Sequence, residues 1–136
     1  MTMKTTAKDI MTRELIVAKE GMKVEEALKL LMKHKVTGMP VVDHDGKVLG
    51  ILSEYDIIAN VAQEDRLEPK FFEKNIEYTK TVASVVEDAS LSEVLDHFIN
   101  KKIRRLPVLD KCNRLVGLIS RRDIMRVLYY RAKVGE

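Results

Sequence analysis

The sequence has few of the residues that cross-link or anchor a chain. Cys112 is the single cysteine among 136 residues, so no disulfide can form within the chain and a disulfide-stabilised secreted scaffold is excluded. A lone cysteine favours a reducing compartment. The longest apolar run, residues 48–52, is far shorter than the roughly 20 residues that cross a bilayer. Residues 1–9 lack the apolar stretch of a signal peptide, and we expect a cytoplasmic protein without a membrane partner.

The sequence also lacks a strong excess of either charge. The 24 Lys and Arg residues against 21 Asp and Glu residues give a net charge of 24 − 21 = +3, whereas nucleic-acid-binding domains usually carry a larger or clustered basic charge. Hydrophobic residues make up 46% and charged residues 33% of the chain, which is typical of a globular domain and not of a disordered chain. A chain of this length can bury a core without a structural metal.

What the sequence does contain is an internal repeat with an offset of 67 residues. Without a gap, residues 39–43 (Met-Pro-Val-Val-Asp) align with residues 106–110 (Leu-Pro-Val-Leu-Asp). Residues 50–57 (Gly-Ile-Leu-Ser-Glu-Tyr-Asp-Ile) align with residues 117–124 (Gly-Leu-Ile-Ser-Arg-Arg-Asp-Ile). Self-similarity of this kind indicates two copies of one structural unit.

Each copy has an amphipathic helix before its best-matched motifs. Apolar residues recur at i, i+3, i+4 and i+7 in residues 24–31 and again in residues 91–98, which predicts one helix in each copy. Ser90 and Glu93 have the spacing of a capping box at the start of the second of these helices.

A β-hairpin follows the helix in each copy. The first strand is predicted at residues 40–42 or 107–109, with proline as its first residue, where a missing N–H donor is tolerated. The turns end on Gly46 and Asn113, two residue types that accept a positive φ. Gly50 and Gly117 are interpreted as backbone positions of the hairpins. The second strands are predicted at residues 47–52 and 114–119.

A second helix is predicted to begin at a Ser-x-x-Asp sequence in each copy. Ser53 with Asp56, and Ser120 with Asp123, match an N-terminal capping signature with Asp in place of the usual Glu. Each copy therefore reads strand, helix, strand, strand, helix. Because one copy has too little apolar area to cover both sheet faces, we expect an α/β (α+β) fold in which two small sheets, each with two helices, pack around a pseudo-twofold axis.

We expect one module over residues 1–136. Its first repeat spans residues 7–60, a connecting segment spans residues 61–75, and the second repeat spans residues 76–131. Phe71 and Phe72 are predicted to dock the connecting segment.

The paired motifs resemble the tandem cystathionine-β-synthase (CBS) domain pair, or Bateman module. The matching pattern is apolar-Pro-apolar-apolar-Asp followed by Gly-apolar-apolar-Ser-x-x-Asp-apolar, and it occurs twice with a helix before each copy. The resemblance covers nearly the whole chain and is that of a stand-alone pair. It implies a regulatory ligand-binding module for adenine nucleotides (AMP, ADP or ATP) or S-adenosylmethionine, commonly assembled as a homodimer.

The resemblance also implies two candidate ligand sites, with Asp56 or Asp123 accepting ribose hydroxyls and the following helix N-terminus facing phosphate. Site one comprises Thr12, Ile16, Thr37, Gly38, Met39, Pro40, Ser53 and Asp56. Site two comprises Thr79, Ala83, Arg104, Arg105, Leu106, Pro107, Ser120, Arg121, Arg122 and Asp123. Two plainer interpretations stay open: Ser-x-x-Asp is also an ordinary helix cap, and the prolines are also ordinary strand residues.

The two candidate sites differ in charge. Four arginines of the second repeat occupy positions where the first repeat has Thr, Gly, Glu and Tyr. Arginine forks bind phosphate through charge-assisted hydrogen bonds, so our hypothesis is that site two is the main nucleotide site. The alternative is that these arginines form a solvated face or a dimer contact.

Other chemistry-bearing residues indicate neither a metal site nor catalysis. The histidines His34, His44 and His97 lack metal-ligand spacing with Cys112, and His97 is predicted on the polar side of its helix. No glycine-rich phosphate loop and no nucleophile motif occurs, so we expect no enzyme and no required cofactor. The core-filling methionines are predicted to be Met11, Met32, Met39 and Met125.

The leading hypothesis is therefore a nucleotide-sensing module that signals through a conformational change to an unidentified regulated protein. The alternatives are a constitutive dimerisation or scaffold module without ligand, and a sensor of S-adenosylmethionine.

Overall fold

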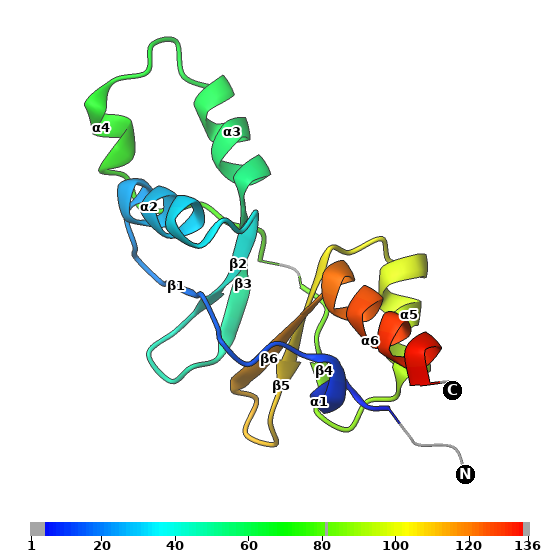
Figure 1. Ribbon diagram of the computed structural model, residues 1–136. Coiled ribbons are helices and arrows are strands. Elements are labelled where there is room, and N and C mark those ends of the chain that lie inside the picture. Colours follow the sequence, from blue (N-terminus) through cyan, green and yellow to red (C-terminus); the bar gives the residue numbers. More distant parts are fainter. Residues whose placement is uncertain (1–4, 81, 135–136) are drawn as a thin grey trace. The chain divides into compact units, whose positions relative to one another are not determined.

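The computed structural model describes residues 5–80 and 82–134, and the chain divides into two compact units (Figure 1). The first-repeat unit is Ile16–Val82. The second-repeat unit combines Met1–Leu15 with Ala83–Glu136. Each unit has a core of its own, so the two are described separately.

The first-repeat unit contains the predicted order of strand, helix, strand, strand and helix. Its three-stranded sheet has the order β1-β2-β3, with β1 parallel to β2 and β2 antiparallel to β3. A short extra helix, α4, lies against α2 (Figure 1). The elements are β1 (Ala18–Lys19), α2 (Val24–His34), β2 (Gly38–Val42), β3 (Val48–Ser53), α3 (Glu54–Ala62) and α4 (Pro69–Phe72).

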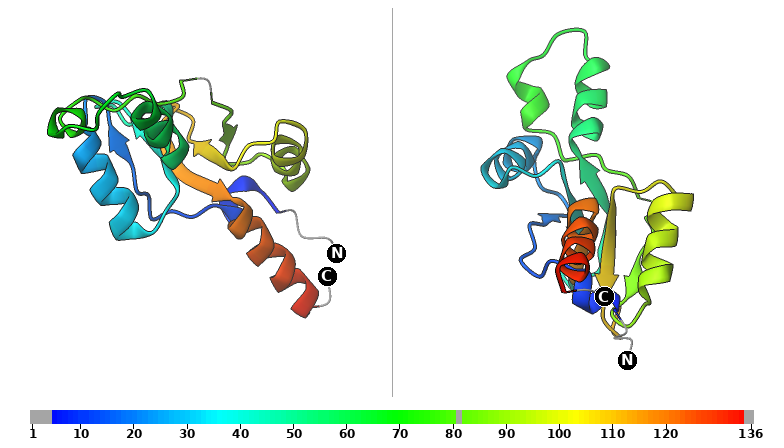
Figure 2. Two further views of the ribbon diagram at one scale, coloured as in Figure 1. Left: turned by 90° about the horizontal axis from the view of Figure 1, so that it is seen from above. Right: turned by 45° about the vertical axis from the view of Figure 1, so that its right-hand side comes forward.

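The second-repeat unit has the same topology, with the sheet order β4-β5-β6. In the left view of Figure 2, β6 runs directly into the long helix α6. The elements are α1 (Ala7–Ile10), β4 (Val85–Val86), α5 (Leu91–Asn100), β5 (Arg105–Leu109), β6 (Leu115–Ser120) and α6 (Arg121–Val134). The α/β class and the two small sheets with helices agree with the sequence prediction.

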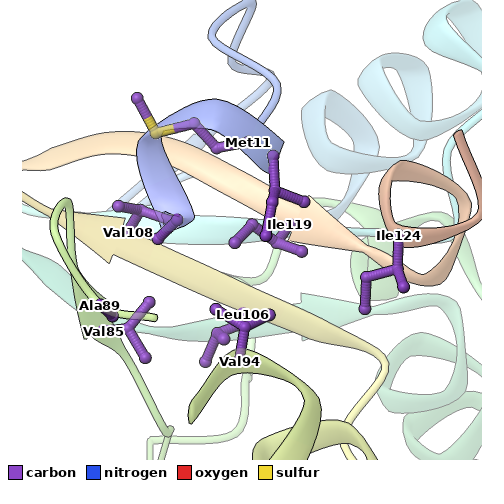
Figure 3. Close-up of a cluster of buried hydrophobic side chains, with 10 residues drawn as sticks. Met11, Val85, Ala89, Val94, Leu106, Val108, Ile119 and Ile124 are labelled. Atoms are coloured by element: carbon purple, nitrogen blue, oxygen red, sulfur yellow. The ribbon is translucent and has the colours of Figure 1, made fainter. Parts of the chain in front are cut away.

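Each unit is held by one apolar cluster. Figure 3 shows Val94 of α5, Ile124 of α6 and Met11, the residue after α1, around strands β5 and β6. In the first-repeat unit, Phe71 of α4 is buried in the corresponding cluster and Phe72 packs against it, as predicted. Phe71 and Phe72 meet edge to face with ring centroids 5.5 Å apart. The connecting segment is therefore part of a folded unit.

The prolines lie at the third residue of β2 and β5, not at the predicted first residue. Pro40 pairs with Ile51, and the N–H and C=O of Ile51 point away from Pro40 because both bond to Thr79. Pro40 and Ile51 therefore form a non-hydrogen-bonded pair, in which the missing proline N–H costs no bond to β3.

The structure corrects the predictions for His97, Met32 and Met125 and confirms the prediction for the two turns. His97 is buried, with 8% of its surface exposed, because it faces the packed side of α5. Met32 and Met125 are exposed and do not fill a core, unlike Met11 and Met39. The turn prediction is confirmed by φ values of +82° at Gly46 and +63° at Asn113.

Candidate ligand-binding sites

Each repeat places one aspartate at the start of the helix that follows its hairpin. Asp56 Oδ2 accepts hydrogen bonds from the backbone N–H of Ser53 at 2.8 Å and from its hydroxyl at 3.0 Å. Asp123 Oδ2 accepts the same two bonds from Ser120 at the same distances. In return, each serine Oγ accepts from the aspartate N–H at 3.3 Å. Both predicted capping signatures are thus formed.

The second carboxylate oxygen of each aspartate faces a threonine. Thr79 Oγ1 donates to Asp56 Oδ1 at 3.3 Å, and Thr12 Oγ1 donates to Asp123 Oδ1 at 2.7 Å. Backbone bonds hold both threonines in place: Thr79 exchanges two with Ile51, and Thr12 exchanges two with Leu118. The two threonines are 79 − 12 = 67 residues apart, so each repeat builds the same Thr–Asp pair.

In the structure, each threonine contacts the aspartate of the other predicted site. The sequence analysis grouped Thr12 with Asp56 and Thr79 with Asp123, whereas the structure pairs Thr12 with Asp123 and Thr79 with Asp56. The reason is that the segment before each repeat bridges to the hairpin of the other repeat, with which it forms one unit. The sequence offset shows that the threonines are equivalent, but it cannot show which hairpin each one joins.

The remaining wall residues stay with the repeat to which they were assigned. Ile16 packs against the first-repeat core and Ala83 against the second-repeat core. Gly38, Met39 and Pro40 are buried in β2, and Leu106 and Pro107 are buried in β5. The side chains of Met39 and Leu106 are fully buried, so only their backbone can face a ligand. Thr37 is exposed, and its carbonyl accepts from the Glu54 N–H at 2.9 Å.

The basic residues of site two lie at its helix start and strand start. Arg121 and Arg122 are exposed in the first turn of α6, and Arg104 is exposed just before β5. Arg105 is partly buried as the first residue of β5. The sequence analysis missed Arg126, whose guanidinium nitrogen lies 2.8 Å from Asp123 Oδ1. The sequence did contain a signal for this contact: Arg126 is three residues after Asp123, and the matching position of the first repeat holds Ala59.

The two carboxylates therefore differ in surroundings. Asp123 is 3% exposed, and the exposed side chain of Arg126 covers it. Asp56 is only partly buried. Among the described residues, no three His, Cys, Asp or Glu side chains gather as metal ligands would, and no described helix is long and apolar enough to cross a membrane.

Comparisons with known proteins place these sites in a family. The CBS domain family matches residues 7–63 and 74–130. Homoserine O-acetyltransferase of Methanohalobium evestigatum is 30% identical over 125 residues, which cover 91% of this chain and 24% of that protein. The chain thus spans about a quarter of the length of this relative.

Two solved structures match over almost their full length. The CBS domain pair of protein MJ0100, in complex with 5-methylthioadenosine and S-adenosyl-L-methionine, is 32% identical with a TM-score of 0.79, covering 94% of this chain and 98% of that chain. CBSX2 in complex with AMP is 32% identical with a TM-score of 0.79, covering 92% and 96%. With both repeats matched and the topology shared, this chain belongs to the CBS domain family and contains a tandem pair of CBS domains.

Proposed function

We propose that this chain is a regulatory module that binds adenine nucleotides at its two Thr–Asp pairs. The observation that carries the proposal is the repeated site: each helix start presents a carboxylate with a threonine hydroxyl on one of its oxygens. A carboxylate that accepts two hydroxyl protons recognises a ribose diol, and free N–H groups at a helix start attract phosphate.

Two similar structures support an adenosine-containing ligand. CBSX2 was solved with AMP and the MJ0100 pair with 5-methylthioadenosine and S-adenosyl-L-methionine, and these ligands share an adenosine group. S-adenosylmethionine carries a sulfonium cation, which the exposed Arg121 and Arg122 would repel. We infer that the second-repeat site takes AMP, ADP or ATP in preference to S-adenosylmethionine.

Signalling requires that the ligand bind two states of the module with different affinity. We propose that occupancy of the CBS pair changes the conformation presented to a separate regulated protein, and that the chain itself catalyses no reaction. A constitutive scaffold without ligand is the alternative, and ligand binding distinguishes the two.

Isothermal titration calorimetry with AMP, ATP and S-adenosylmethionine tests the proposal. Asp56→Asn and Asp123→Asn each keep one oxygen for the serine cap but replace the other by an NH2 group that cannot accept from ribose. Each should lose one site, with affinity reduced about tenfold or more. Asp43→Asn and Asp110→Asn make the same replacement in the hairpin turns, outside both sites, and should retain binding. No binding of any adenine ligand to the wild-type chain would refute the proposal and leave the scaffold.

We further propose that the module is a homodimer. In the second-repeat unit, Ile99, Met125 and Leu128 are exposed around a groove of about 550 Å³ between α5 and α6. In the first-repeat unit, Met32 and Ile58 are also exposed. They are the repeat counterparts of Ile99 and Met125, at the offset of 67 residues. Exposed apolar side chains repeated at matching positions favour a second copy of the chain as the partner.

Light scattering of the wild type and of an Ile58→Asp, Met125→Asp double variant tests the dimer. The wild type should have twice the chain mass and the variant the mass of one chain, because a charge on each face would be buried without a partner. A monomeric wild type would exclude the dimer.

A further inference from the structure

The hydrogen bonds at Asp123 differ from those at Asp56 by one donor. A carboxylate offers about four acceptor positions. At Asp123, Ser120 supplies two donors, Thr12 one and Arg126 one, so all four positions are filled.

At Asp56 the described residues supply three donors instead of four. Ser53 gives two bonds, and Thr79 gives one at 3.3 Å. The helix position that carries Arg126 in the second repeat holds Ala59 in the first, and the alanine methyl group donates no bond. Asp56 thus retains an open acceptor position and Asp123 does not.

A ribose can reach Asp123 only if one of these donors leaves, and Arg126 is the one able to do so. Ser120 belongs to the helix cap, and Thr12 is fixed by two backbone bonds to Leu118. The Arg126 side chain is 63% exposed, against 4% for Asp123, and a long exposed side chain can adopt other rotamers. Its departure breaks a charge-assisted bond that an uncharged ligand cannot replace.

A phosphorylated ligand can replace that bond. Arg126 shares the N-terminal part of α6 with the exposed Arg121 and Arg122, where the helix dipole is also positive. A phosphate placed there would accept from the released guanidinium and reduce the repulsion among the three cations. The first repeat has Glu54, Tyr55 and Ala59 at the matching positions and offers no such arginine cluster.

We propose that Arg126 makes the Asp123 site selective for phosphorylated nucleosides, whereas the Asp56 site also accepts uncharged ribonucleosides. Arg126 occupies Asp123 in the empty site and moves to the phosphate when a nucleotide binds. The inference rests on the proposed function, because it assigns the ligand class of each of the two proposed sites.

The test compares adenosine with AMP at each site by calorimetry. Asp56→Asn isolates the Asp123 site and Asp123→Asn isolates the Asp56 site. At the isolated Asp123 site AMP should bind about tenfold or more tighter than adenosine, and at the isolated Asp56 site the two affinities should be closer. Adding Arg126→Ala to Asp56→Asn should strengthen adenosine binding and reduce the AMP preference. Adding Ala59→Arg to Asp123→Asn should weaken adenosine binding at the Asp56 site.

Lys133→Ala provides the matched control, because it removes an exposed cation from the same helix and should leave the AMP preference unchanged. Melting temperatures of all variants confirm that they are folded. An unchanged AMP-to-adenosine ratio after Arg126→Ala, or an equal loss for both ligands, overturns the role of Arg126 while leaving the proposed function intact. Failure of the wild type to bind either ligand overturns both.

Discussion

At the residue scale, the second-repeat unit contains a buried histidine, His97, at a position where the first repeat has a leucine. His97 Nδ1 is buried and finds no hydrogen-bond partner among the described residues. Its counterpart 67 residues earlier is Leu30, which packs against the first-repeat core. A buried nitrogen without a partner costs free energy that an apolar side chain of similar volume does not.

His97→Leu should therefore stabilise the chain by about 1 kcal/mol. Urea unfolding followed by circular dichroism measures the change. His34→Leu, the same replacement at an exposed position of α2, should change stability by less than about 0.5 kcal/mol. A loss of stability in His97→Leu would show that the imidazole makes a favourable contact.

The hairpin turns make stability depend on pH. The Lys47 and Asp45 amides bond to Asp43 Oδ1 and lower the pKa of that carboxyl below its usual 3.8. The Arg114 and Cys112 amides do the same for Asp110. Because these pKa values are lower in the folded chain, the unfolded chain binds more protons. The stabilisation is thus present above about pH 4 and is lost as pH falls through the lowered pKa values.

The double variant Asp43→Asn, Asp110→Asn should lose less stability than the wild type between pH 5 and pH 2.5, in the acid range set by these carboxyls. Asparagine keeps the acceptor oxygen in the turn but does not ionise. Urea unfolding at a series of pH values measures the slope, with the exposed Asp65→Asn as the control for the loss of one charge. Identical slopes in the double variant and the wild type would contradict the prediction.

Residue types with local roles could be predicted from the sequence. The Ser53–Asp56 and Ser120–Asp123 caps are local, because each needs only the chain within three residues. The contact of Arg126 with Asp123 depends on which rotamer a long side chain adopts, and the burial of His97 depends on what packs against α5. Spacing places Arg126 three residues after Asp123, but it fixes neither the Arg126 rotamer nor the packing around His97.

At the element scale, Gly50 and Gly117 allow a separate segment to approach a strand closely. A Cβ atom added at Gly50 would lie 2.2 Å from the Thr79 carbonyl oxygen and 2.6 Å from the Tyr78 ring. One added at Gly117 would lie 2.1 Å from Met11 Sδ. The glycines predicted as hairpin backbone positions are thus required by the segments that carry Thr12 and Thr79.

Gly50→Ala should destabilise the chain more than Gly117→Ala, by about 3 against about 1 kcal/mol. At Gly50 the nearest obstacle is a backbone oxygen with an aromatic ring beside it, whereas at Gly117 the nearest atoms all belong to the Met11 side chain, whose outer part can rotate. Urea unfolding measures both variants. Met11→Ala should reduce the cost of Gly117→Ala, giving a favourable coupling in the double-mutant cycle. Equal costs at the two glycines, or no coupling with Met11, would contradict this explanation.

The order of helices and strands followed from apolar periodicity, because α2 and α5 each bury one stripe of side chains. The bridging segments had no such signal. Each contributes a single isolated bridge to the neighbouring hairpin, Thr12 with Leu118 and Thr79 with Ile51, and one bridge produces no sequence period. This is why the sequence could not show which aspartate each threonine contacts.

At the scale of the whole molecule, some residues of one repeat are buried in the core of the other repeat. Ala7, Ile10 and Met11 begin the first repeat in sequence but are buried in the second-repeat core. Phe71 lies in the connecting segment and Ile76 begins the second repeat, but both are buried in the first-repeat core. Each unit is therefore completed by residues adjacent in sequence to the other repeat.

Ile10→Ala and Ile76→Ala should thus destabilise opposite units. Removing a buried isoleucine costs about 2–5 kcal/mol through lost burial and the cavity that remains. In native-state hydrogen exchange, Ile10→Ala should accelerate the amides of Val108 and Ile119 more than those of Val41 and Leu52, and Ile76→Ala should do the reverse. The two variants control for each other, since both remove the same atoms. Faster exchange in the repeat that is nearer in sequence would show that the N-terminal segment belongs to the first repeat after all.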